Sequence, residues 1–483
     1  MGNPPFPLRL FSAILMLISA NAGEDLPQLS IRTFHQRGID MYLHGTSKIN
    51  SRGHLEIGGC DVTDLAKEFG TPLYIVDEVL VRRRAREFMD AFRSTGLRHQ
   101  VAYASKAFCV MAMCRIAEEE GMSLDVVSDG ELYTALQAGF PAERIHFHGN
   151  NKTPDEILMA LDANIGCFVV DNFIELQLLN ALAGEKGKRV NVLLRITPGV
   201  EAHTHEYIST GQQDSKFGFD LGNGTAFRAV ETALAQPNLK LLGVHSHIGS
   251  QIFEVEGFRM AVEKVAAFAI EVRDRLSETF AVINLGGGFG IRYVEGDTPL
   301  PVGQYVHAIA DAIQSSCAAA NYPLPEIWIE PGRSIVGDAG TTLYTVGTSK
   351  DIPGVRKYIA VDGGMTDNPR PALYESKYDA ILANRADDPL VETVSVAGKA
   401  CESGDMLIWD LNLPKVESGD LLAVFCTGAY NYAMASNYNR IRRPAVVFVK
   451  DGKADLVVAR ESHRDIVGND IIPERLKKQA VTQ

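Results

Sequence analysis

Short apolar, β-branched runs alternate with helically patterned segments from residue 72 to residue 290. The eight runs are 72–78, 99–105, 122–128, 144–149, 165–172, 190–196, 240–249 and 281–290. Continuous apolar strands that alternate with helices are typical of a parallel sheet covered on both faces. Eight such units predict an N-terminal (β/α)8 TIM-type barrel rather than an open doubly wound sheet.

After about residue 330 the pattern changes to short alternating strands separated by turn residues, with Asp451-Gly452 marking a hairpin. The sequence therefore predicts an α/β barrel over 72–330 and a mostly β, β-barrel-like domain over 331–483. The strand-like segment 41–71 is expected to join the C-terminal β domain. Residues 1–40 are expected to be an N-terminal extension outside the fold.

The N-terminal extension contains an apolar run, Leu10–Ala20, that follows Arg9 and precedes Ala22-Gly23. This arrangement resembles a secretory signal with its cleavage site, and the run is too short to span a bilayer. A disordered extension is the alternative. The remaining chain favours a cytoplasmic location, because its 7 cysteines are an odd number without any CxxC pair. A targeted or exported form stays open.

Composition narrows the classes of function. The chain has 483 residues, of which 46% are hydrophobic and 22% charged, an ordinary globular composition. Its 47 basic and 60 acidic side chains give a net charge of −13. This balance disfavours a nucleic-acid groove or a membrane surface as a partner, while a local basic pocket for a small anion remains compatible with it.

The residues that could take part in catalysis or ligand binding lie at the ends of predicted strands, where active sites of (β/α)8 barrels are found. Lys106 ends the run VAYASK, and removal from water there is expected to lower the pKa of its ammonium group and to prepare a Schiff-base nucleophile. An ordinary surface lysine is the alternative. His148 also ends a strand.

Three further segments suggest an anion site beside a heteroaromatic ring. Gly286-Gly287-Gly288 leaves backbone N–H groups free to close around a phosphate, although a plain tight turn is an equal alternative. Glu330 and Arg333 follow the strand EIWI. The carboxylate could hold a ring nitrogen and the arginine could bind an anion, or the two could form a buried ion pair with each other. In HSHIGS, His247 could stack on a ring and Ser250 could bind phosphate; no metal site is expected, because this stretch lacks an acidic ligand.

The ordered set of motifs resembles the fold type III pyridoxal phosphate decarboxylases. The motifs are YASKAF, SLDVVSDGEL, HGNNK, RITPGVEAHTHEYISTG, HSHIGSQ, LGGGFG, EPGRSIV, DGGMTDNPRPALY, GKACESGD and GAYNYAMASNYN. The resemblance covers roughly residues 41 to 470. The resemblance implies a barrel followed by a β domain, pyridoxal 5'-phosphate as cofactor, and a homodimer with active sites shared between subunits.

The resemblance also implies roles for individual residues. Lys106 would form the Schiff base, Glu330 would keep the pyridine nitrogen protonated, and His247 would stack on the ring. Phosphate contacts would come from Ser250, Gly287, Gly288, Arg333 and Tyr430. Asp125 and Glu131 would support the site.

Within that family the chain most resembles enzymes that convert meso-2,6-diaminopimelate to L-lysine and carbon dioxide, the last step of lysine biosynthesis. That substrate carries an amine and a carboxylate at its distal end, so the pocket needs both a cation and an anion there. Arg370 and Tyr374 match the carboxylate-binding pair, assisted by Arg333 and Tyr430, and Glu402 matches the residue that meets the distal amine. Cys401 resembles the acid that returns a proton after carbon dioxide leaves.

Two alternatives stay open at this point. A related ornithine, arginine or lysine decarboxylase would share the barrel and the cofactor, but its substrate would end in a cation. A non-catalytic homologue that binds pyridoxal phosphate would keep the fold and release no carbon dioxide.

Overall fold

The computed structural model describes residues 33–36, 39–200 and 215–477. The chain divides into two compact units, Met1–Leu43 and His44–Gln483. In the first unit, β1 (Thr33–Gln36) and β2 (Ile39–Tyr42) form an antiparallel pair. The signal-like segment 1–22 lies outside the described residues. Among the described helices, none combines the length and the apolar character that a membrane crossing requires.

In the second unit, eight parallel strands close into a barrel. Neighbours follow the order β10, β9, β8, β7, β15, β14, β13 and β11, and β11 pairs with β10 to close the ring. The strands are β7 (His99–Ala104), β8 (Ser123–Val126), β9 (Ile145–Phe147), β10 (Cys167–Val170), β11 (Val190–Thr197), β13 (Leu239–His245), β14 (Val282–Asn284) and β15 (Glu326–Ile329). The predicted fold class is confirmed.

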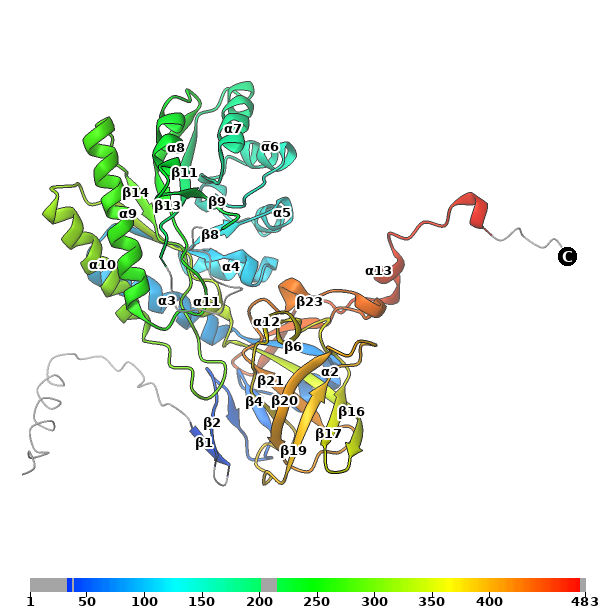
Figure 1. Cartoon of the computed structure of the whole chain (residues 1–483). Coiled ribbons are helices and arrows are strands. Elements are labelled where there is room, and N and C mark those ends of the chain that lie inside the picture. The colour runs from blue at the N-terminus through cyan, green and yellow to red at the C-terminus, as the bar shows by residue number, and fades with distance from the viewer. Residues whose placement is uncertain (1–32, 37–38, 201–214, 478–483) are drawn as a thin grey trace, which may run out of the picture. The chain divides into compact units, whose positions relative to one another are not determined.

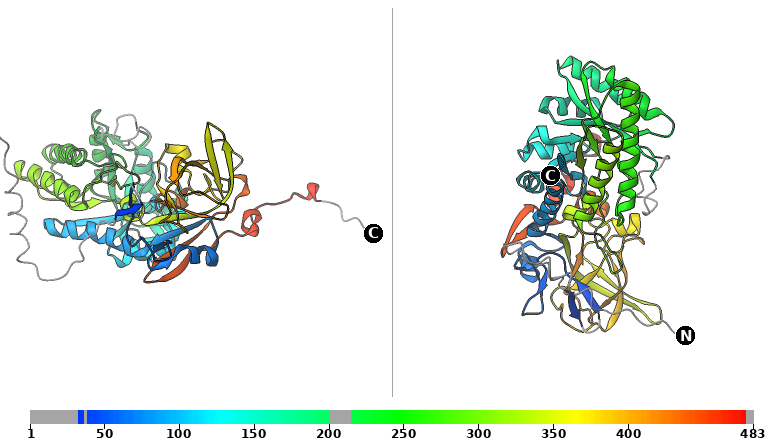
Figure 2. Two further views of the ribbon diagram at one scale, coloured as in Figure 1. Left: turned by 90° about the horizontal axis from the view of Figure 1, so that it is seen from below. Right: turned by 90° about the vertical axis from the view of Figure 1, so that its left-hand side faces the viewer.

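Helices surround these strands (Figures 1 and 2). They are α3 (Glu78–Thr95), α4 (Met111–Glu119), α5 (Asp129–Gln137), α6 (Pro154–Ala163), α7 (Phe173–Glu185), α8 (Thr225–Leu234), α9 (Val255–Leu276) and α10 (Val302–Ala319). Several begin at a side chain that caps the first turn, such as Ser128 before α5, Asn172 before α7 and Thr153 before α6. These caps fix where each strand-to-helix connection ends.

The second sheet is mostly antiparallel, and all but one of its strands follow the barrel in the chain. Its path is β20, β19, β17, β16, β6, β22 and β23, with β21 bridging β16 and β18. The strands are β6 (Leu73–Asp77), β16 (Gly340–Ile352), β17 (Arg356–Val361), β18 (Ala380–Leu382), β19 (Glu392–Ala397), β20 (Met406–Leu413), β21 (Leu421–Phe425), β22 (Ala445–Lys450) and β23 (Lys453–Val458). The hairpin predicted at Asp451-Gly452 joins β22 to β23.

The prediction that 72–78 supplies a barrel strand is wrong. That run forms β6, which pairs with β16 and β22 in the second sheet. The eighth barrel strand is β15, the run that precedes Glu330. All five residues of β6 are buried, so its continuous apolar character reflects a central strand of the other sheet.

Shorter elements complete the second unit. A small sheet of β3 (Lys48–Ile49), β4 (Leu55–Ile57) and β5 (Cys60–Asp61) precedes α2 (Val62–Phe69). Leu55 N–H donates to Ala383 O and Ala386 N–H donates to Gly53 O, so this small sheet contacts the β18 region. The boundaries proposed at 40, 71 and 330 stay a prediction. The remaining short elements are β12 (Phe219–Asp220), α11 (Arg333–Val336), α12 (Arg370–Tyr374) and α13 (His463–Val467).

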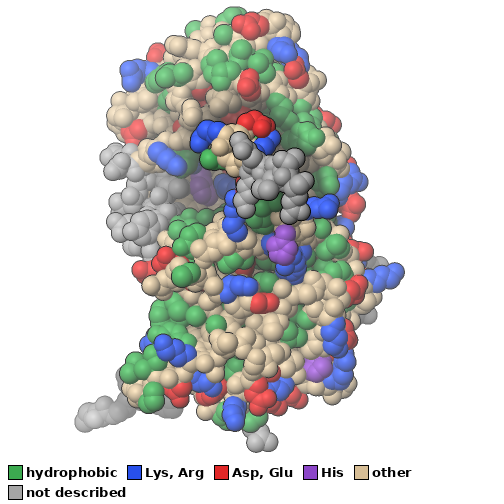
Figure 3. All heavy atoms as spheres, turned by 90° about the vertical axis from the view of Figure 1, so that its right-hand side faces the viewer, with side chains coloured by type: hydrophobic (Ala, Val, Ile, Leu, Met, Phe, Trp, Pro, Cys, Tyr) green, Lys and Arg blue, Asp and Glu red, His purple; other side chains and the backbone are tan. Residues whose placement is uncertain are grey.

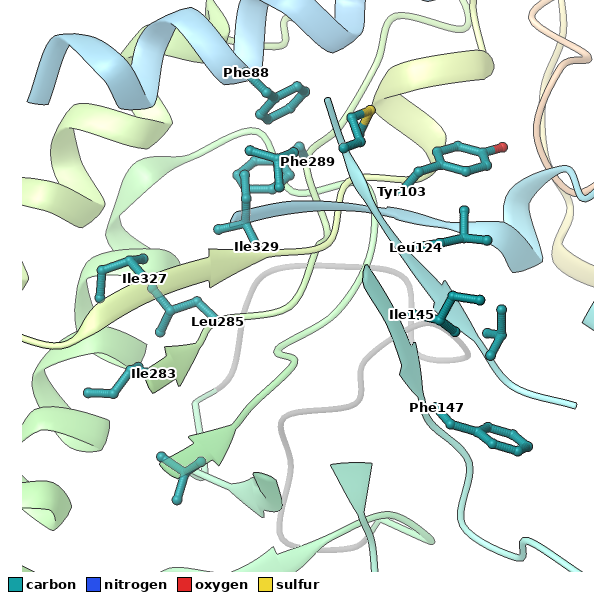
Figure 4. Packing of buried hydrophobic residues seen from close by; sticks show 14 of the residues in the cluster. Phe88, Tyr103, Leu124, Ile145, Phe147, Ile283, Leu285, Phe289, Ile327 and Ile329 are labelled. Carbon is teal, nitrogen blue, oxygen red and sulfur yellow. The ribbon is translucent and has the colours of Figure 1, made fainter. Parts of the chain in front are cut away.

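Apolar side chains on the outer face of the barrel strands pack beneath the helices. Ile283, Ile327 and Ile329 belong to neighbouring strands of this buried cluster (Figure 4). Phe289 stacks on Phe258 with ring centroids 4.8 Å apart. This layer fixes the strand ends that carry the candidate site.

The lower interior of the barrel contains a buried histidine, His146, stacked on Trp328 with ring centroids 4.3 Å apart. Burial lowers the pKa of His146 to about 3. In the unfolded chain this histidine takes up a proton below about pH 6.5, whereas in the folded chain it stays neutral down to about pH 3. The free energy of unfolding therefore decreases as the pH falls through this window.

The free energy of unfolding should decrease between pH 7 and pH 4 in the wild-type protein. We expect this decrease to be smaller in His146→Phe, by up to roughly 3 kcal/mol. Phenylalanine keeps the stacking on Trp328 but cannot be protonated. Urea unfolding at both pH values measures the effect, with His307→Phe, at an exposed site on α10, as control. An unchanged pH dependence in His146→Phe would contradict the assignment.

Candidate active site

A cavity of about 500 Å³ opens at the carboxyl ends of the barrel strands. Residues 370–374 and 430–434 of the second sheet's connections complete its wall. Figure 3 shows one face of the molecule recessed, with basic side chains and a histidine visible there. The lining residues are Ala104, Lys106, Val127, His148, Gly149, Asn150, Arg195, Phe217, His245, His247, Ser250, Gly287, Gly288, Phe289, Glu330, Gly332, Arg333, Arg370, Tyr374, Tyr430 and Met434.

Eleven of the residues that the sequence singled out meet in this cavity. They are Lys106, His148, His247, Ser250, Gly287, Gly288, Glu330, Arg333, Arg370, Tyr374 and Tyr430. Cys401 and Glu402 are absent from the described lining, and both are exposed. Asp125 and Glu131 lie behind the lining and interact electrostatically with Lys106.

Lys106 lies in the 3-10 turn Ser105–Ala107 that directly follows β7. Its side chain is 44% exposed, and Nζ lies 3.9 Å from Asp125 Oδ2. Removal from water pulls the pKa of Lys106 down, but the charges of Asp125, Tyr430 and Glu330 outweigh this effect and hold the pKa above its usual value. The prediction of a lowered pKa is therefore wrong, because the strand end is surrounded by acidic groups.

Asp125, at the end of β8, is fully buried, and neither of its carboxylate oxygens has a hydrogen-bond partner. Burial raises the pKa of Asp125, although His148 and Lys106 oppose the increase. Glu131 accepts a hydrogen bond of 2.7 Å from Val127 N–H, and burial beside Asp125 raises its pKa to about 7. The floor of the cavity thus contains two buried carboxyl groups whose pKa values are raised above those of exposed carboxyl groups.

Glu330 follows β15 and is surrounded by nitrogen atoms. Asn284 Nδ2 donates to Oε1 at 2.6 Å, His245 Nε2 lies 3.1 Å from Oε2, and His148 Nε2 lies 3.0 Å from Oε1. Burial alone would raise the pKa of Glu330, but interactions with His148 and His245 hold it well below its usual value. The carboxylate is therefore ionised and suited to a cationic group in the cavity.

The histidines around Glu330 were only partly anticipated. His148, His245 and Glu330 lie close enough for one atom of each to meet a metal ion, a combination that the local sequence motifs do not indicate because the three residues come from different strands. Burial lowers the pKa of His245 to about 4, so it is neutral at physiological pH and serves as a hydrogen-bond donor to the carboxylate.

His247, Gly287 and Gly288 line one side of the cavity. Gly287 N–H donates to His247 Nδ1 at 3.2 Å, and burial holds the pKa of His247 well below its usual value. A Cβ on Gly287 would lie 2.2 Å from the carbonyl oxygen of Glu330, and Gly288 has φ 113°. Both positions therefore require glycine, and the backbone approaches the cavity closely there.

Two buried arginines share one tyrosine at the cavity. Arg333 Nη1 donates to Tyr293 Oη at 2.5 Å, and Arg370 Nη1 donates to the same oxygen at 2.8 Å. Arg333 Nη2 also donates to Ser250 Oγ at 2.9 Å, and Arg370 Nη1 also donates to Tyr378 Oη at 3.0 Å. The phenol of Tyr293 thus fixes the spacing of two cationic groups that can each bind an anion.

Tyr430 lies in the segment that follows β21, and it contacts the 3-10 turn that contains Lys106. Its N–H donates to Ala107 O at 2.8 Å, and its ring lies 4.9 Å from the Arg333 guanidinium carbon. Its backbone has φ 61°, a conformation that non-glycine residues rarely adopt. The strained backbone places the phenol over the same region as Arg333.

Several lining residues were not assigned in advance, notably Asn150, Arg195, Phe217 and Met434. Arg195 belongs to β11, and the rule that strand ends carry the site could have identified it. Asn150 and Met434 fall within the motifs HGNNK and GAYNYAMASNYN, but the residue types of the other three are common in loops and cores and do not by themselves indicate a role in the site.

The comparisons with known proteins now define the class. Residues 79–337 match the family model described as pyridoxal-dependent decarboxylase, pyridoxal binding domain. This match and the barrel with its acidic, arginine-rich cavity identify a pyridoxal-dependent decarboxylase.

Full-length relatives narrow the class. The chain is 63% identical over 431 residues to the diaminopimelate decarboxylase of Bacillus subtilis (strain 168), covering 89% of this chain and 98% of that protein. It is 49% identical to the Staphylococcus aureus (strain COL) enzyme of the same name, covering 88% and 99%. The chain belongs to the diaminopimelate decarboxylase family.

Solved structures of related decarboxylases are also similar to this chain. Diaminopimelate decarboxylase from M. jannaschii in co-complex with L-lysine has a TM-score of 0.84 and 38% identity, covering 89% of this chain and 99% of that one. A lysine/ornithine decarboxylase from Vibrio vulnificus complexed with putrescine has a TM-score of 0.69 at 23% identity, covering 81% and 97%, and shares the fold.

Proposed function

We propose that this chain decarboxylates meso-2,6-diaminopimelate to L-lysine and carbon dioxide with pyridoxal 5'-phosphate as cofactor, the last step of lysine biosynthesis. The observation that carries the proposal is a single cavity that contains Lys106, an ionised Glu330 and two separate arginines, Arg333 and Arg370. One arginine serves a phosphate, and the second is available for a distal carboxylate. The relatives named diaminopimelate decarboxylase support the choice of substrate.

The residues present fit pyridoxal phosphate. Gly287 and Gly288 leave a close approach that a Cβ would block, beside Ser250 and Arg333, as a phosphate requires. The ionised carboxylate of Glu330 matches a protonated ring nitrogen, and the neutral His247 offers a flat face. Bound there, the cofactor supplies a protonated heteroaromatic ring that accepts the electron pair released when the bond to the substrate carboxylate breaks.

Side chains of the protein itself would carry out the proton transfers. Lys106 Nζ must lose a proton before it can act as a nucleophile, because acidic neighbours keep its pKa high. Asp125 Oδ2, at 3.9 Å and without a hydrogen-bond partner, is positioned to accept that proton after a small side-chain rotation. Glu330 holds a proton on the ring nitrogen by remaining ionised itself.

Arg370 provides the basis for substrate choice. Its guanidinium is buried, and it is held by Tyr293 and Tyr378 beside the lining residue Tyr374. A distal carboxylate would form a charge-assisted pair with it, whereas the distal cation of ornithine or lysine would be repelled. This contrast distinguishes the proposal from a related basic amino acid decarboxylase.

A carbon dioxide release assay tests the proposal. The purified protein with added pyridoxal phosphate is supplied in parallel with meso-diaminopimelate, ornithine, arginine and lysine. Release from diaminopimelate at a kcat/KM at least about 100-fold above the others is expected from one buried charge pair. Preference for ornithine would favour the related decarboxylase, and no release from any of the four would favour a non-catalytic homologue.

The active protein is proposed to be a homodimer with shared active sites, in which Cys401 and Glu402 act in the partner's cavity. Cys401 is exposed, outside its own chain's described cavity lining, and its N–H donates to Asn439 Oδ1 at 2.7 Å. Its thiol would return the proton to the substrate carbon, and Glu402 would meet the distal amine. A cytoplasmic location is proposed as well, because all seven cysteines are free thiols.

Mixing two inactive variants tests the shared site. Lys106→Ala and Cys401→Ala homodimers should each be nearly inactive, and a mixture that has exchanged subunits should recover about a quarter of wild-type activity. About half of randomly formed dimers are mixed, and each mixed dimer has one intact site and one doubly defective site. Carbon dioxide release before and after exchange measures the recovery; none in demonstrated mixed dimers would mean that Cys401 acts within its own chain.

A further inference from the structure

The C-terminal arm, residues 462–477, carries apolar side chains that its own chain does not cover. Figure 1 shows it running away from the sheet that precedes it. Val467, Ile471, Ile472 and Leu476 are 54 to 88% exposed, and Ile466 alone among the arm's residues is partly buried. Scattered exposed apolar residues are ordinary, but four exposed aliphatic side chains within the ten residues 467–476 indicate a contact surface.

The base of the arm has a defined conformation. Ser462 and Asp465 form a reciprocal cap at the start of α13. Arg440 Nη1 donates to Ile466 O at 2.6 Å, and Arg440 Nη2 pairs with Asp470 Oδ2 at 2.7 Å. These bonds hold the base of the arm in one position relative to the β domain. The apolar residues of the arm are therefore more restricted in direction than those of a flexible tail.

That fixed point is also the anchor of the Cys401 turn. Asn439, next to Arg440 in the chain, accepts the hydrogen bond from Cys401 N–H. Asn439 and Arg440 both have positive φ, 51° and 56°, so adjacent residues direct one side chain to the Cys401 turn and the other to the arm. The arm and the Cys401 turn therefore start from the same part of the β domain.

Three exposed apolar side chains lie at the rim of the barrel. Met111, Tyr133 and Ile174 are 55 to 77% exposed and lie in the first two turns of α4, α5 and α7. Because these helices begin where the strands end, the three side chains border the end of the barrel at which the cavity opens. A partner that delivers Cys401 and Glu402 to this cavity would bring its arm to this rim.

We propose that the C-terminal arm packs on a second copy of this chain, across the rim of the barrel whose cavity receives Cys401 and Glu402. This inference rests on the shared site proposed above and identifies the segment that holds it together. Burial of the four aliphatic side chains supplies association free energy, and the Arg440 anchor reduces the entropy cost of ordering the arm. In a two-fold dimer the contact occurs twice.

Two variants test the arm through the stability of the dimer. The first ends the chain after Glu461, and the second carries Ile471→Asp with Ile472→Asp in the full-length arm. Both should raise the dimer dissociation constant at least tenfold in sedimentation equilibrium of the cofactor-loaded enzyme. Activity per site should fall on dilution and return at high protein concentration. Val355→Asp, at a 75% exposed site between β16 and β17, is the matched control and should leave the dissociation constant unchanged.

Cross-linking identifies the surface that the arm contacts. A photoreactive residue at position 472, in dimers mixed from isotopically light and heavy subunits, should join light to heavy chains at the first turns of α4, α5 or α7. Cross-links confined to one chain, or an unchanged dissociation constant in both arm variants, would overturn the inference. A wild-type protein that fails to decarboxylate diaminopimelate while the arm variants still weaken the dimer would refute the proposed function alone.

Discussion

Lys106→Ala is expected to abolish decarboxylation and the covalent attachment of pyridoxal phosphate together, while the protein folds normally. Turnover should fall by about 10³-fold or more, because both the nucleophile and a proton-transfer group are lost. The side chain is 44% exposed in the cavity, and it takes no part in the buried apolar packing, so its removal should cost little stability. Borohydride reduction followed by mass spectrometry measures the attachment, and carbon dioxide release measures turnover.

Lys264→Ala is the matched control for this experiment. Lys264 donates to Gly199 O and lies outside the described lining of the cavity, so its replacement should keep both the attachment and the activity. Adding free pyridoxal phosphate to Lys106→Ala should restore bound cofactor, since the Arg333 and Glu330 contacts remain. A Lys106→Ala protein that is still trapped covalently through another lysine would overturn the assignment.

Arg370→Ala should lose on the order of 2 to 5 kcal/mol of transition-state binding for diaminopimelate, with little change in cofactor affinity. Arg370 is buried, and removing it leaves the phenols of Tyr293 and Tyr378 without their shared donor. Steady-state kcat/KM gives the loss, and titration with pyridoxal phosphate gives the cofactor affinity.

Two companion variants sharpen the interpretation of Arg370→Ala. Tyr293→Phe keeps both guanidinium groups but removes the oxygen that spaces them, so it should weaken cofactor and substrate binding together by a smaller factor. Arg356→Ala removes a partly exposed arginine that stacks on Trp409, away from the described lining, and should be neutral. An unchanged kcat/KM in Arg370→Ala would show that this guanidinium does not bind the substrate.

The error at 72–78 shows what an apolar run can and cannot specify. The run correctly predicts a fully buried strand, since every residue of β6 is buried. Burial on both faces is shared by barrel strands and by the centre of the second sheet, so the run itself does not select the partner strand. The pairing of β6 with β16, more than 260 residues later in the chain, decides the sheet.

The candidate site was predictable to the extent that its chemistry is concentrated in local motifs. Lys106, the Gly286–Gly288 turn and Glu330 stand at strand ends, and parallel strands in a barrel bring their carboxyl ends together. The pKa of Lys106 was not predictable from its motif, because Asp125 and Tyr430 come from other parts of the chain. The same holds for Tyr293, whose contact with two arginines depends on the fold.

The sequence by itself determined the barrel followed by a β domain, the family, and the residue types that the cavity contains. Those features follow from short-range periodicity and from motifs in which neighbouring residues act together. Only the tertiary structure decided which sheet holds β6, which charges surround Lys106, and that Cys401 and Glu402 lie outside the described lining of their own chain's cavity. Each of these depends on distances between residues far apart in the chain, and such distances are set by packing and strand pairing, which local sequence patterns do not encode.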